Sequence, residues 1–468
     1  MEVLYILVGI LPYLVEIYFL SYALRYEKPK PKRKSFDDFV SVVVPVHREP
    51  PSEVLQTLKH LEGQSYKNYE VLVMVNNTPE DSYKRPVELY CKTSSFCKYY
   101  DIEVKGFKGG VLNASNQFMN DKTTVVAVVD SDYRVEDQFI KKGLSYMDEE
   151  ISIVQFPQDY RHFPKDIFHR AMYLAYRYFF AVIMRMCHVL NAVAFMGTVG
   201  FIKKDAITQA GRWSERIITE DSEMGLRLNI KGFRGIYVDE TVGRGLMPLS
   251  WMSCRKQRFR WAYGNAQTIL KYFYYLTVGK SLTLKQKVAF WVQNTVWHTP
   301  LLTSLILGFA GYKFSLLGLG LLLGFFLSKL YGFLYVYRKI DQLSFKDSLL
   351  ALIFYLSLFF PMSYAPLRAL VPVDVPFYRT PKESTKEKKL LIGEVVTGFL
   401  ILSLFVLSLV RKDWGGFAIS ILSFPLFGSL AWALYQEKKS GRSVSRPLRA
   451  SFVRSRISSN ANLSQELR

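Results

Sequence analysis

Long apolar stretches are concentrated in two parts of the chain, and this uneven distribution limits most strongly what the chain can fold into. One stretch covers residues 1–24 and several follow residue 288, whereas residues 35–261 mix charged and apolar side chains as a water-exposed domain does. About 20 consecutive apolar residues suffice to cross the hydrocarbon core of a membrane. The distribution predicts a multi-pass membrane protein that carries one globular domain.

The charge balance supports this interpretation. The 468 residues include 61 Lys and Arg against 40 Asp and Glu, a net charge of +21. The basic clusters at 28–34, 337–339 and 382–389 flank apolar stretches, as cytoplasmic loops of membrane proteins do. We therefore expect contact with membrane lipid, no nucleic-acid partner, and a globular domain on the cytoplasmic side of the cell membrane.

The four cysteines, Cys91, Cys97, Cys187 and Cys254, show no CxxC spacing and no histidine at the spacing of a metal site. In zinc-binding sequences the cysteines recur in close pairs. The sequence therefore predicts neither a disulfide framework nor a zinc site.

The membrane part is expected to contain five spans. Residues 1–24 form a retained anchor, 288–336 a helical hairpin with arms 288–311 and 314–336, and 390–436 a second hairpin. The tail, 437–468, is basic and poor in apolar residues, so we expect it to lie in the cytoplasm near anionic lipid.

Residues 349–371 are apolar but contain Pro361 and Pro366, which remove helix hydrogen-bond donors. Their flanks are basic on both sides. These features favour an interfacial or re-entrant segment on the cytoplasmic surface, with a kinked spanning helix as the alternative.

Alternating strand and helix patterns organise residues 35–265. The Val-rich runs 39–45, 69–75 and 123–129 predict buried parallel strands, and 52–62 has the apolar spacing of a helix. This pattern indicates an α/β nucleotide-binding domain, in which ligands bind beyond the carboxyl ends of the strands. The polar clusters of the sequence fall at these ends.

Asp130 and Asp132 directly follow the strand expected at 123–129. Two carboxylates one residue apart at a strand end can approach a divalent cation, which in turn neutralises a diphosphate. A surface turn is the structural alternative.

Three more clusters contain side chains that could bind a ligand or act in catalysis. Lys108, followed by two glycines, can contact phosphate, or it belongs to a basic turn before a helix at 111–119. Glu220 and Asp221 precede a helix at 222–230, so a carboxylate there could act as general base or cap the helix.

The run from Gln257 to Trp261 closes the domain. Arg260 could hold a phosphate through two hydrogen bonds, and Trp261 offers a flat face to a sugar ring. A basic and aromatic membrane border would have a similar composition.

Taken in order, Asp130-Ser-Asp132, Thr219-Glu-Asp221 and Gln257-Arg-Phe-Arg-Trp261 resemble the processive family 2 glycosyltransferases, which include cellulose, chitin and hyaluronan synthases. The resemblance covers about residues 38–265 and a second region near 377–382. It implies a GT-A fold inserted in an α-helical transmembrane region, a nucleoside-diphosphate sugar donor, a Mn²⁺ or Mg²⁺ ion, and inversion at the anomeric carbon.

The resemblance also implies roles for individual residues. Asp221 is expected to be the general base with Glu220 beside it, and Asp132 to bind the metal together with Asp130. The expected donor contacts are His47, Glu49, Asn77, Lys108, Asn113, Asp130, Arg260, Thr380 and Lys382. The expected acceptor contacts are Gly197, Thr198, Gln257 and Trp261.

A gating loop over residues 377–389 completes the implied site, with Phe377 and Arg379 in its motif. Arg379 stands where the family has valine. At the end of the second strand the family has an acidic residue that contacts the base, whereas this chain has Asn76 and Asn77. A UDP-sugar is the expected donor, with base recognition altered by these amides.

Three functions remain open at this stage. The first is extension of a polysaccharide and its passage outward between the spans, along aromatic residues such as Trp291, Trp297, Tyr331 and Tyr335. The second is transfer of one sugar to a lipid acceptor, and the third a non-catalytic sugar-binding membrane protein. Five spans are few for a channel, so a homo-oligomer or an accessory subunit is a further expectation.

Overall fold

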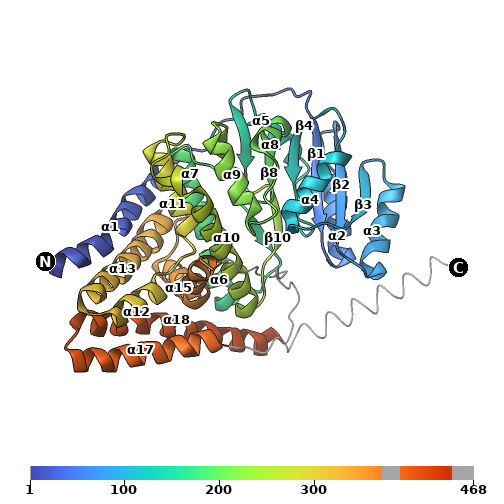
Figure 1. Cartoon of the computed structure of the whole chain (residues 1–468). Helices are drawn as coiled ribbons and strands as arrows, with labels where there is room; N and C mark the ends of the chain where they lie inside the picture. The colour runs from blue at the N-terminus through green and yellow to red at the C-terminus, as the bar shows by residue number, and fades with distance from the viewer. Residues whose placement is uncertain (1, 372–390, 445–468) are drawn as a thin grey trace.

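The computed structural model describes residues 2–371 and 391–444, and these form an α/β domain beside a helical region (Figure 1). The α/β domain extends from β1 (Phe39–Val46) to β10 (Gly243–Leu246), and α10 (Trp251–Thr277) connects it to the helical region. The predicted fold class, an α/β domain inserted among apolar helices, is confirmed.

A mixed sheet of seven strands forms the centre of the α/β domain, in the order β3-β2-β1-β4-β8-β6-β9. Its strands besides β1 are β2 (Tyr69–Asn76), β3 (Cys97–Ile102), β4 (Thr123–Val128), β6 (Ile151–Gln155), β8 (Gly200–Lys203) and β9 (Arg234–Tyr237). The predicted strands β1, β2 and β4 are parallel, so their carboxyl ends lie at one edge. The sheet is mixed because β8 runs antiparallel to both of its neighbours, β4 and β6.

Helices cover both faces of this sheet because its strands are apolar on both sides. One face packs against α2 (Pro51–Glu62), α3 (Asp81–Thr93) and α5 (Phe139–Ser145). The other packs against α4 (Phe107–Ser115), α8 (Lys204–Ala210) and α9 (Glu220–Ile230). A short helix, η2 (Asn116–Phe118), follows α4. The two buried layers fix the edge at which the strands end.

A second, three-stranded sheet lies beside the first, in the order β5-β10-β7. Its strands are β5 (Arg134–Val135), β7 (Asp159–Arg161) and β10. Because β5 follows the aspartates at the end of β4 after a short turn, this sheet holds the segment after those aspartates in place.

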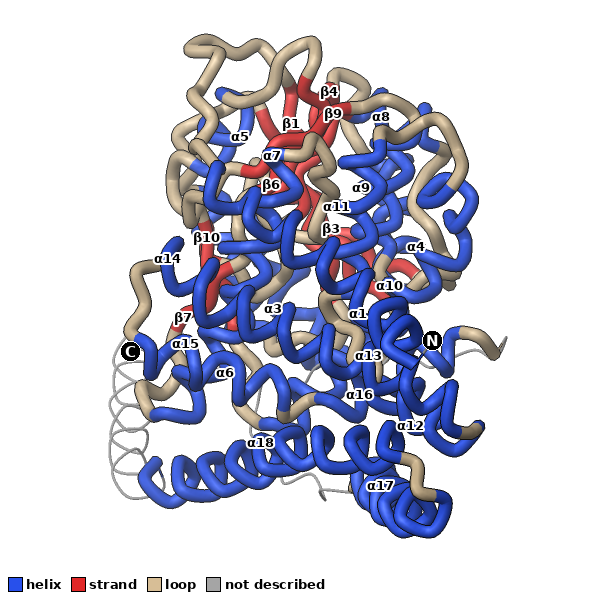
Figure 2. Tube along the Cα trace, turned by 90° about the vertical axis from the view of Figure 1, so that its left-hand side faces the viewer, coloured by secondary structure: helices blue, strands red, loops and turns tan. Residues whose placement is uncertain are grey.

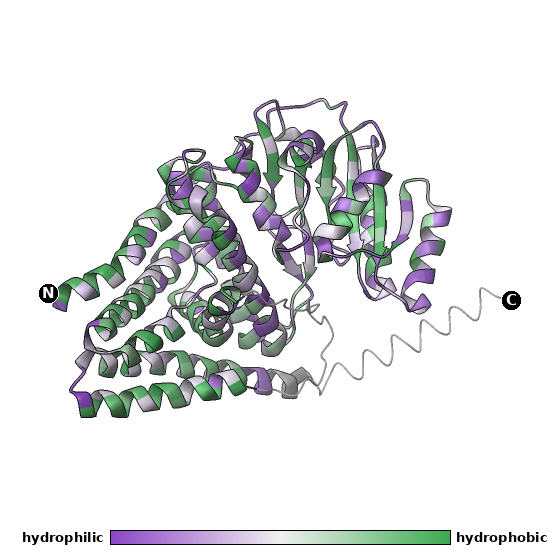
Figure 3. Ribbon diagram, in the orientation of Figure 1, coloured by the Kyte–Doolittle hydropathy of each residue, from purple (hydrophilic) through white to green (hydrophobic). Residues whose placement is uncertain are grey.

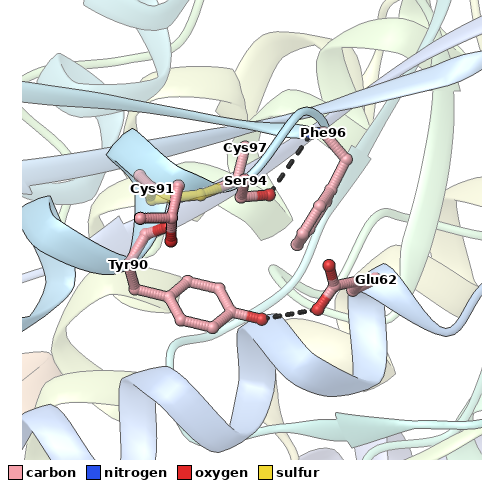
Figure 4. The surroundings of a disulfide bond; sticks show 7 residues. Glu62, Tyr90, Cys91, Ser94, Phe96 and Cys97 are labelled. Atoms are coloured by element: carbon pink, nitrogen blue, oxygen red, sulfur yellow. Dashed lines mark hydrogen bonds between the residues drawn. A yellow bond between two sulfur atoms is a disulfide. The ribbon is translucent and has the colours of Figure 1, made fainter.

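A disulfide joins Cys91, near the end of α3, to Cys97, the first residue of β3 (Figure 4). The turn between them brings their Cα atoms to 5.3 Å. Close by, Tyr90 donates a hydrogen bond to Glu62 on α2. The sequence predicted no disulfide framework and did not reveal this single disulfide, because a tight helix-to-strand turn can bring two cysteines together without CxxC spacing. Cys187 and Cys254 are free and buried.

Within residues 2–371 and 391–444, four helical segments are long and apolar enough to cross a membrane. They are Glu2–Arg25, which comprises α1 (Glu2–Leu20) and η1 (Ser21–Arg25); Tyr312–Ile340; Ile392–Arg411, which is α17; and Trp414–Ser440, within α18 (Trp414–Val444). Figure 3 shows apolar residues dominating α1, α13, α17 and most of α18, in contrast to the mixed helices of the α/β domain. The chain thus contains several candidate membrane spans.

The first predicted hairpin differs from the structure in one arm. Residues 288–311 do not form one helix: α11 (Leu284–Thr295) ends before Pro300, and α12 (Leu301–Ala310) follows. At 1.5 Å per residue, the ten residues of α12 cover about 15 Å, half the thickness of a bilayer core. The prediction of a continuous first arm is therefore wrong. The second arm is continuous over α13 (Tyr312–Leu330), η4 (Tyr331–Tyr337) and α14 (Arg338–Ile340).

The segment 349–371 is bent, as its prolines suggested. It forms α15 (Phe345–Leu356) and α16 (Phe359–Ala369), whose axes differ by 44°. The break lies before Pro361, which falls in the first turn of α16, where a missing N–H costs nothing. The pair has the geometry of a broken span or of a re-entrant loop.

The N-terminal helix α1 packs along α13, and small residues allow their backbones to approach closely (Figure 1). A Cβ atom at Gly320 would lie 2.3 Å from the carbonyl oxygen of Ile6. In the same interface the carboxylate of Glu16 accepts a hydrogen bond from Nζ of Lys329 at 2.6 Å, and both side chains are buried. The two opposite charges therefore neutralise each other between the helices, away from lipid.

The helices α17 and α18 form the second predicted hairpin, which turns at Lys412 and Asp413 and lies at the end of the molecule away from the strands (Figure 2). Helix α18 continues to Val444, beyond the predicted boundary at residue 436. The rest of the predicted tail lies outside the described residues. Asp413 accepts a hydrogen bond from Ser315 of α13, which fixes the hairpin against the bundle.

Helices at the junction tie the α/β domain to the membrane part. They are α6 (Ile167–Tyr178), the π-helix η3 (Phe179–Met184), α7 (Arg185–Val189) and α10. On α10, Arg255 donates two hydrogen bonds to Glu394 of α17, at 2.6 and 3.2 Å. The N–H of Trp251 donates to Glu437 of α18. Contacts at both points hold α10 at a fixed place between the two parts.

Candidate active site

A cavity of about 800 Å³ lies where the carboxyl ends of β1, β2 and β4 face the first turn of α9 and one side of α10. Its polar lining contains most of the residues singled out from the sequence. These are His47, Glu49, Asn77, Lys108, Asp130, Asp132, Gly197, Glu220, Asp221, Gln257, Arg260 and Trp261. Segments up to about 200 residues apart in the chain thus meet in one place.

Lys108, in the first turn of α4, joins three parts of the cavity wall. Its Nζ donates to Oδ1 of Asp130 at 2.6 Å and to the carbonyl of Gly197 at 2.7 Å. Burial lowers the pKa of Lys108, but the carboxylates of Asp130 and Glu220 outweigh it, so the pKa lies above its ordinary value. The ammonium group therefore stays charged in the cavity.

Asp132 is held by the strand next to it. Its Oδ2 accepts the N–H of Leu246 in β10 at 2.9 Å, and its carbonyl accepts a hydrogen bond from Arg161, which also pairs with Glu53. Asp130 and Asp132 both line the cavity, but no group of three or more metal-ligating side chains occurs among the described residues. A Mn²⁺ or Mg²⁺ ion bound by one or two carboxylates and by substrate phosphates fits this donor set.

Glu220 and Asp221 begin α9 at the centre of the cavity. Burial raises the pKa of both carboxyl groups, and the charge of Asp221 adds to the effect on Glu220, whose pKa is raised to about 8. Oδ1 of Asp221 accepts the N–H of Ser222 at 2.8 Å, which orients the carboxylate. A carboxylate with a raised pKa is a stronger base than an exposed one.

The loop before β8 approaches Asp221 closely. Gly197 has φ +84°, and a Cβ atom there would lie 2.4 Å from Oδ2 of Asp221. A side chain at residue 197 would therefore displace the carboxylate. The carbonyl of the same glycine accepts the hydrogen bond from Lys108, so the loop links the two.

One side of α10 supplies Gln257, Arg260 and Trp261 to the cavity. Arg258 points elsewhere: it is buried, and its guanidinium lies 4.3 Å from the ring centroids of both Trp261 and Trp297. Such cation–π contacts stabilise a ring arrangement when they are removed from water. Arg258 therefore fixes the orientation of Trp261, while Arg260 reaches the cavity.

The opposite end of the cavity is lined by His47, Asn76 and Asn77. Nδ1 of His47 lies 3.0 Å from the carbonyl of Asn76. The side-chain amide of Asn77 both donates to and accepts from the backbone of Val104, at 2.9 and 3.0 Å. These bonds hold Asn77 to the segment after β3 and leave less of its amide for a ligand.

Of the predicted site residues that the structure describes, two do not line the cavity. Asn113 on α4 exchanges hydrogen bonds with the backbone of Trp213, at 3.0 and 2.9 Å, and also donates to Glu215. Its side chain holds the 213–215 loop, and its predicted donor contact stays a prediction. Thr198 is buried, and its hydroxyl accepts the N–H of Asp130. It supports Asp130, and its predicted acceptor contact stays a prediction.

The gating-loop residues Phe377, Arg379, Thr380 and Lys382 lie outside the described residues. Their roles stay predictions.

Sequence reasoning missed the wall nearest the membrane part. The additional lining residues there include Gln158, Tyr160, Tyr176, Phe179, Phe180, Asn265 and Gln293. The spacing of Tyr176, Phe179 and Phe180 signals one face of a helix, but it does not show what that face contacts. Of the aromatic residues proposed for an outward path, only Trp297 lines the cavity, whereas Tyr331 and Tyr335 stack on each other at 5.3 Å and Trp291 bonds to Leu276.

Comparisons with known proteins agree with this geometry. The family model described as glycosyl transferase family 2 matches residues 41–206, and the one described as glycosyl transferase family group 2 matches residues 125–364. The chain is 26% identical over 230 residues to the probable glucomannan 4-beta-mannosyltransferase 14 of Arabidopsis thaliana, which covers 47% of this chain and 43% of the relative. It is 24% identical over 236 residues to glucomannan 4-beta-mannosyltransferase 9 of the same plant, covering 48% and 44%. The chain thus spans less than half the length of these relatives.

Among solved structures, a mannosyltransferase from Pyrobaculum calidifontis in complex with GDP-Man and Mn²⁺ has a similar fold, with a TM-score of 0.52 and 17% sequence identity. The alignment covers 76% of this chain and 98% of that structure. This likeness supports the predicted GT-A type of α/β fold. Since the larger family match extends over slightly more than half of the 468 residues, the chain belongs to the family 2 glycosyltransferases.

Proposed function

We propose that this protein transfers a hexose from a nucleoside-diphosphate sugar to a hydroxyl group of a growing saccharide, with inversion at the anomeric carbon. One observation carries the proposal. The cavity holds a partly buried carboxylate, Asp221, together with the cations Lys108 and Arg260 and the aspartates at the end of β4. A base and a diphosphate site thus share one space.

The reaction is a single displacement. The acceptor oxygen forms a bond to the anomeric carbon as the bond from that carbon to the diphosphate oxygen breaks, and the proton of the hydroxyl passes to Asp221. Lys108 and Arg260 stabilise the charge that develops on the leaving diphosphate. Asp130 and Asp132 would hold a Mn²⁺ or Mg²⁺ ion, which supplies further positive charge to the diphosphate.

The acceptor half of the cavity favours a saccharide over a lipid. It combines the flat rings of Tyr176, Trp261 and Trp297 with the amides of Gln257 and Gln293. Aromatic faces pack against sugar rings, and amides bond their hydroxyls, whereas an acyl chain would leave these amides without partners. Extension of a polysaccharide, followed by its translocation across the membrane, is accordingly the proposed overall process.

GDP-mannose is the first donor to test, since the relatives are named as glucomannan mannosyltransferases and the similar structure contains GDP-Man. UDP-glucose and UDP-N-acetylglucosamine test the expectation drawn from the sequence. The cytoplasmic position of the α/β domain and the action of a gating loop at 377–389 belong to the same proposal. A cysteine introduced at residue 380 should react only with reagents supplied from inside the cell.

The experiment uses the full chain in lipid nanodiscs with Mn²⁺ and each donor in turn, and it measures nucleoside-diphosphate release and product size. A product that lengthens with time supports polymer extension. A product with one sugar that extracts into organic solvent would show a lipid acceptor, and no release with any donor and added oligosaccharide would contradict the proposal.

A further inference from the structure

The cavity continues along α10 beyond the predicted acceptor motif. Gln257, Trp261 and Asn265 are spaced four residues apart, so they lie on one stripe of the helix, and all three line the cavity. From Gln257 to Asn265 the helix rises about 12 Å. This length exceeds one pyranose ring, so the stripe has room for more than the sugar that accepts the transfer.

Asn265 has an unused hydrogen-bonding group at the far end of this stripe. Asn265 is only 6% exposed, and its side-chain amide forms no hydrogen bond with any residue in the part of the chain that the structure describes. The amide offers two donors and one acceptor. Burying such a group without partners is costly, so a ligand hydroxyl at this point would be stabilised.

A second amide lies in the same wall, on α11. Gln293 is almost fully buried. Its Oε1 accepts a hydrogen bond from the Cys187 thiol at 3.4 Å, an ordinary distance for sulfur, whereas its Nε2 lies 3.5 Å from Oγ of Ser222. Hydrogen bonds between nitrogen and oxygen weaken beyond about 3.2 Å. Gln293 therefore keeps bonding capacity for a ligand, and its contact with Ser222 places it next to the base, Asp221.

A flat apolar surface completes this end of the cavity. The ring of Trp297 lies 5.4 Å from that of Trp261, centroid to centroid, and both contact the guanidinium of Arg258. Two aromatic faces beside two amides form the combination that binds a sugar ring by its face and its hydroxyls.

We propose that Asn265 and Gln293 form a second acceptor subsite, which binds the hydroxyl groups of the saccharide unit next to the unit that receives the new sugar. This inference rests on the proposed function and makes it more specific. It predicts that the acceptor is an oligosaccharide of at least two units. A monosaccharide should bind more weakly because it cannot form the hydrogen bonds to Asn265 and Gln293.

The test measures binding of β-1,4-linked manno- and gluco-oligosaccharides of one to four units to the full chain in nanodiscs with GDP and Mn²⁺, by isothermal titration calorimetry. For the wild-type protein, affinity should rise by about tenfold from one unit to two, the gain expected from one or two hydrogen bonds. Asn265→Leu, which keeps the volume and removes the amide, and Asn265→Ala, which leaves space, should both abolish this gain. If Asn265→Ala binds the two-unit sugar as the wild type does, the hydrogen-bond role is overturned.

Thr268→Val is the matched control, because Thr268 is buried one turn further along α10, donates a hydrogen bond to the carbonyl of Gly264, and is not part of the cavity lining among the described residues. It should keep the wild-type length dependence, and GDP affinity reports folding in every variant. Equal wild-type affinity for one and two units of both series would refute the subsite. Length-dependent binding that requires Asn265, without transfer from any donor, would instead refute the proposed function and leave the subsite standing.

Discussion

Gly197 and Asp221 are in such close contact that a single methyl group at residue 197 would lie 2.4 Å from Oδ2 of the carboxylate. We expect Gly197→Ala to displace Asp221 and to lower transfer by about 100-fold, because small displacements of a reacting group have effects of that size. Gly232→Ala is the control: Gly232 also has positive φ, at +88°, but no atom lies within 4 Å of the position that a Cβ atom would take there. If both variants lose activity equally, backbone strain and not the contact with Asp221 is responsible.

Asp221→Asn should remove the group that accepts the proton and should keep the shape of the site. The variant keeps an oxygen that can accept the N–H of Ser222. We expect the rate of transfer to fall by about 100- to 10,000-fold, the range for loss of a general base, while nucleotide affinity stays within about twofold. Stopped-time assays of sugar transfer and nucleotide titrations measure the two quantities. Wild-type turnover in this variant would remove Asp221 from its proposed role.

The stability of the protein without ligand should depend on Glu220. Its pKa is raised from 4.5 to about 8, first by burial and then by the charge of Asp221. The neutral form is therefore favoured in the folded state, so this contribution to stability is complete below pH 4.5 and is lost as the pH rises towards 8. Glu220→Gln cannot ionise and should show a smaller fall in melting temperature between about pH 5 and pH 8. Exposed Glu103→Gln should behave as the wild type; an unchanged pH dependence in Glu220→Gln would argue against a buried, neutral Glu220.

We expect the Mn²⁺ dependence of nucleotide binding to change when Asp132 is substituted. Asp132→Asn keeps an oxygen for the N–H of Leu246 but removes the negative charge. We expect the Mn²⁺ concentration that supports nucleotide binding to rise by at least about tenfold, since even changes behind metal ligands have effects of roughly 10- to 100-fold. Nucleotide affinity measured across a Mn²⁺ titration gives the result, and overlapping curves for variant and wild type would exclude Asp132 as a ligand.

The disulfide should stabilise the edge of the α/β domain. Cys91 and Cys97 are six residues apart. A disulfide that closes so short a loop lowers the entropy of the unfolded chain and thereby raises the free energy of unfolding by about 2 kcal/mol. The double variant Cys91→Ser/Cys97→Ser should therefore melt at a lower temperature than the oxidised wild type. A reducing agent should lower the melting temperature of the wild type but not of the variant. Equal sensitivity of both would place the effect elsewhere, for example at Cys187 or Cys254.

Local patterns in the sequence were enough to predict much of this structure. The Val-rich runs at β1, β2 and β4 can only be buried between helices, and this arrangement places the clusters that follow them at one edge of the sheet. For the same reason Asp130, Asp132 and Lys108 were foreseen in one site. The α/β domain and the apolar helices around it follow from patterns that act over a few residues.

Contacts between distant parts of the chain could not be predicted from the sequence. Asn113 was given a ligand contact because of its place in a motif, but its partner is the backbone of Trp213, 100 residues away. The wall formed by Asn265 and Gln293 depends on how α10 packs against α11, which no local spacing reveals. Likewise, the break between α11 and α12 shows that average hydropathy over 288–311 does not report where a helix stops.

The buried pair of Glu16 and Lys329 has a consequence for biogenesis. The two residues are 313 positions apart, and the whole α/β domain is synthesised between them. Until α13 leaves the ribosome, α1 carries a carboxylate without its partner, which is unfavourable in lipid. The N-terminal helix can therefore reach its final position only after the catalytic domain has been translated, so this ion pair makes completion of the enzyme a condition for closing the membrane bundle.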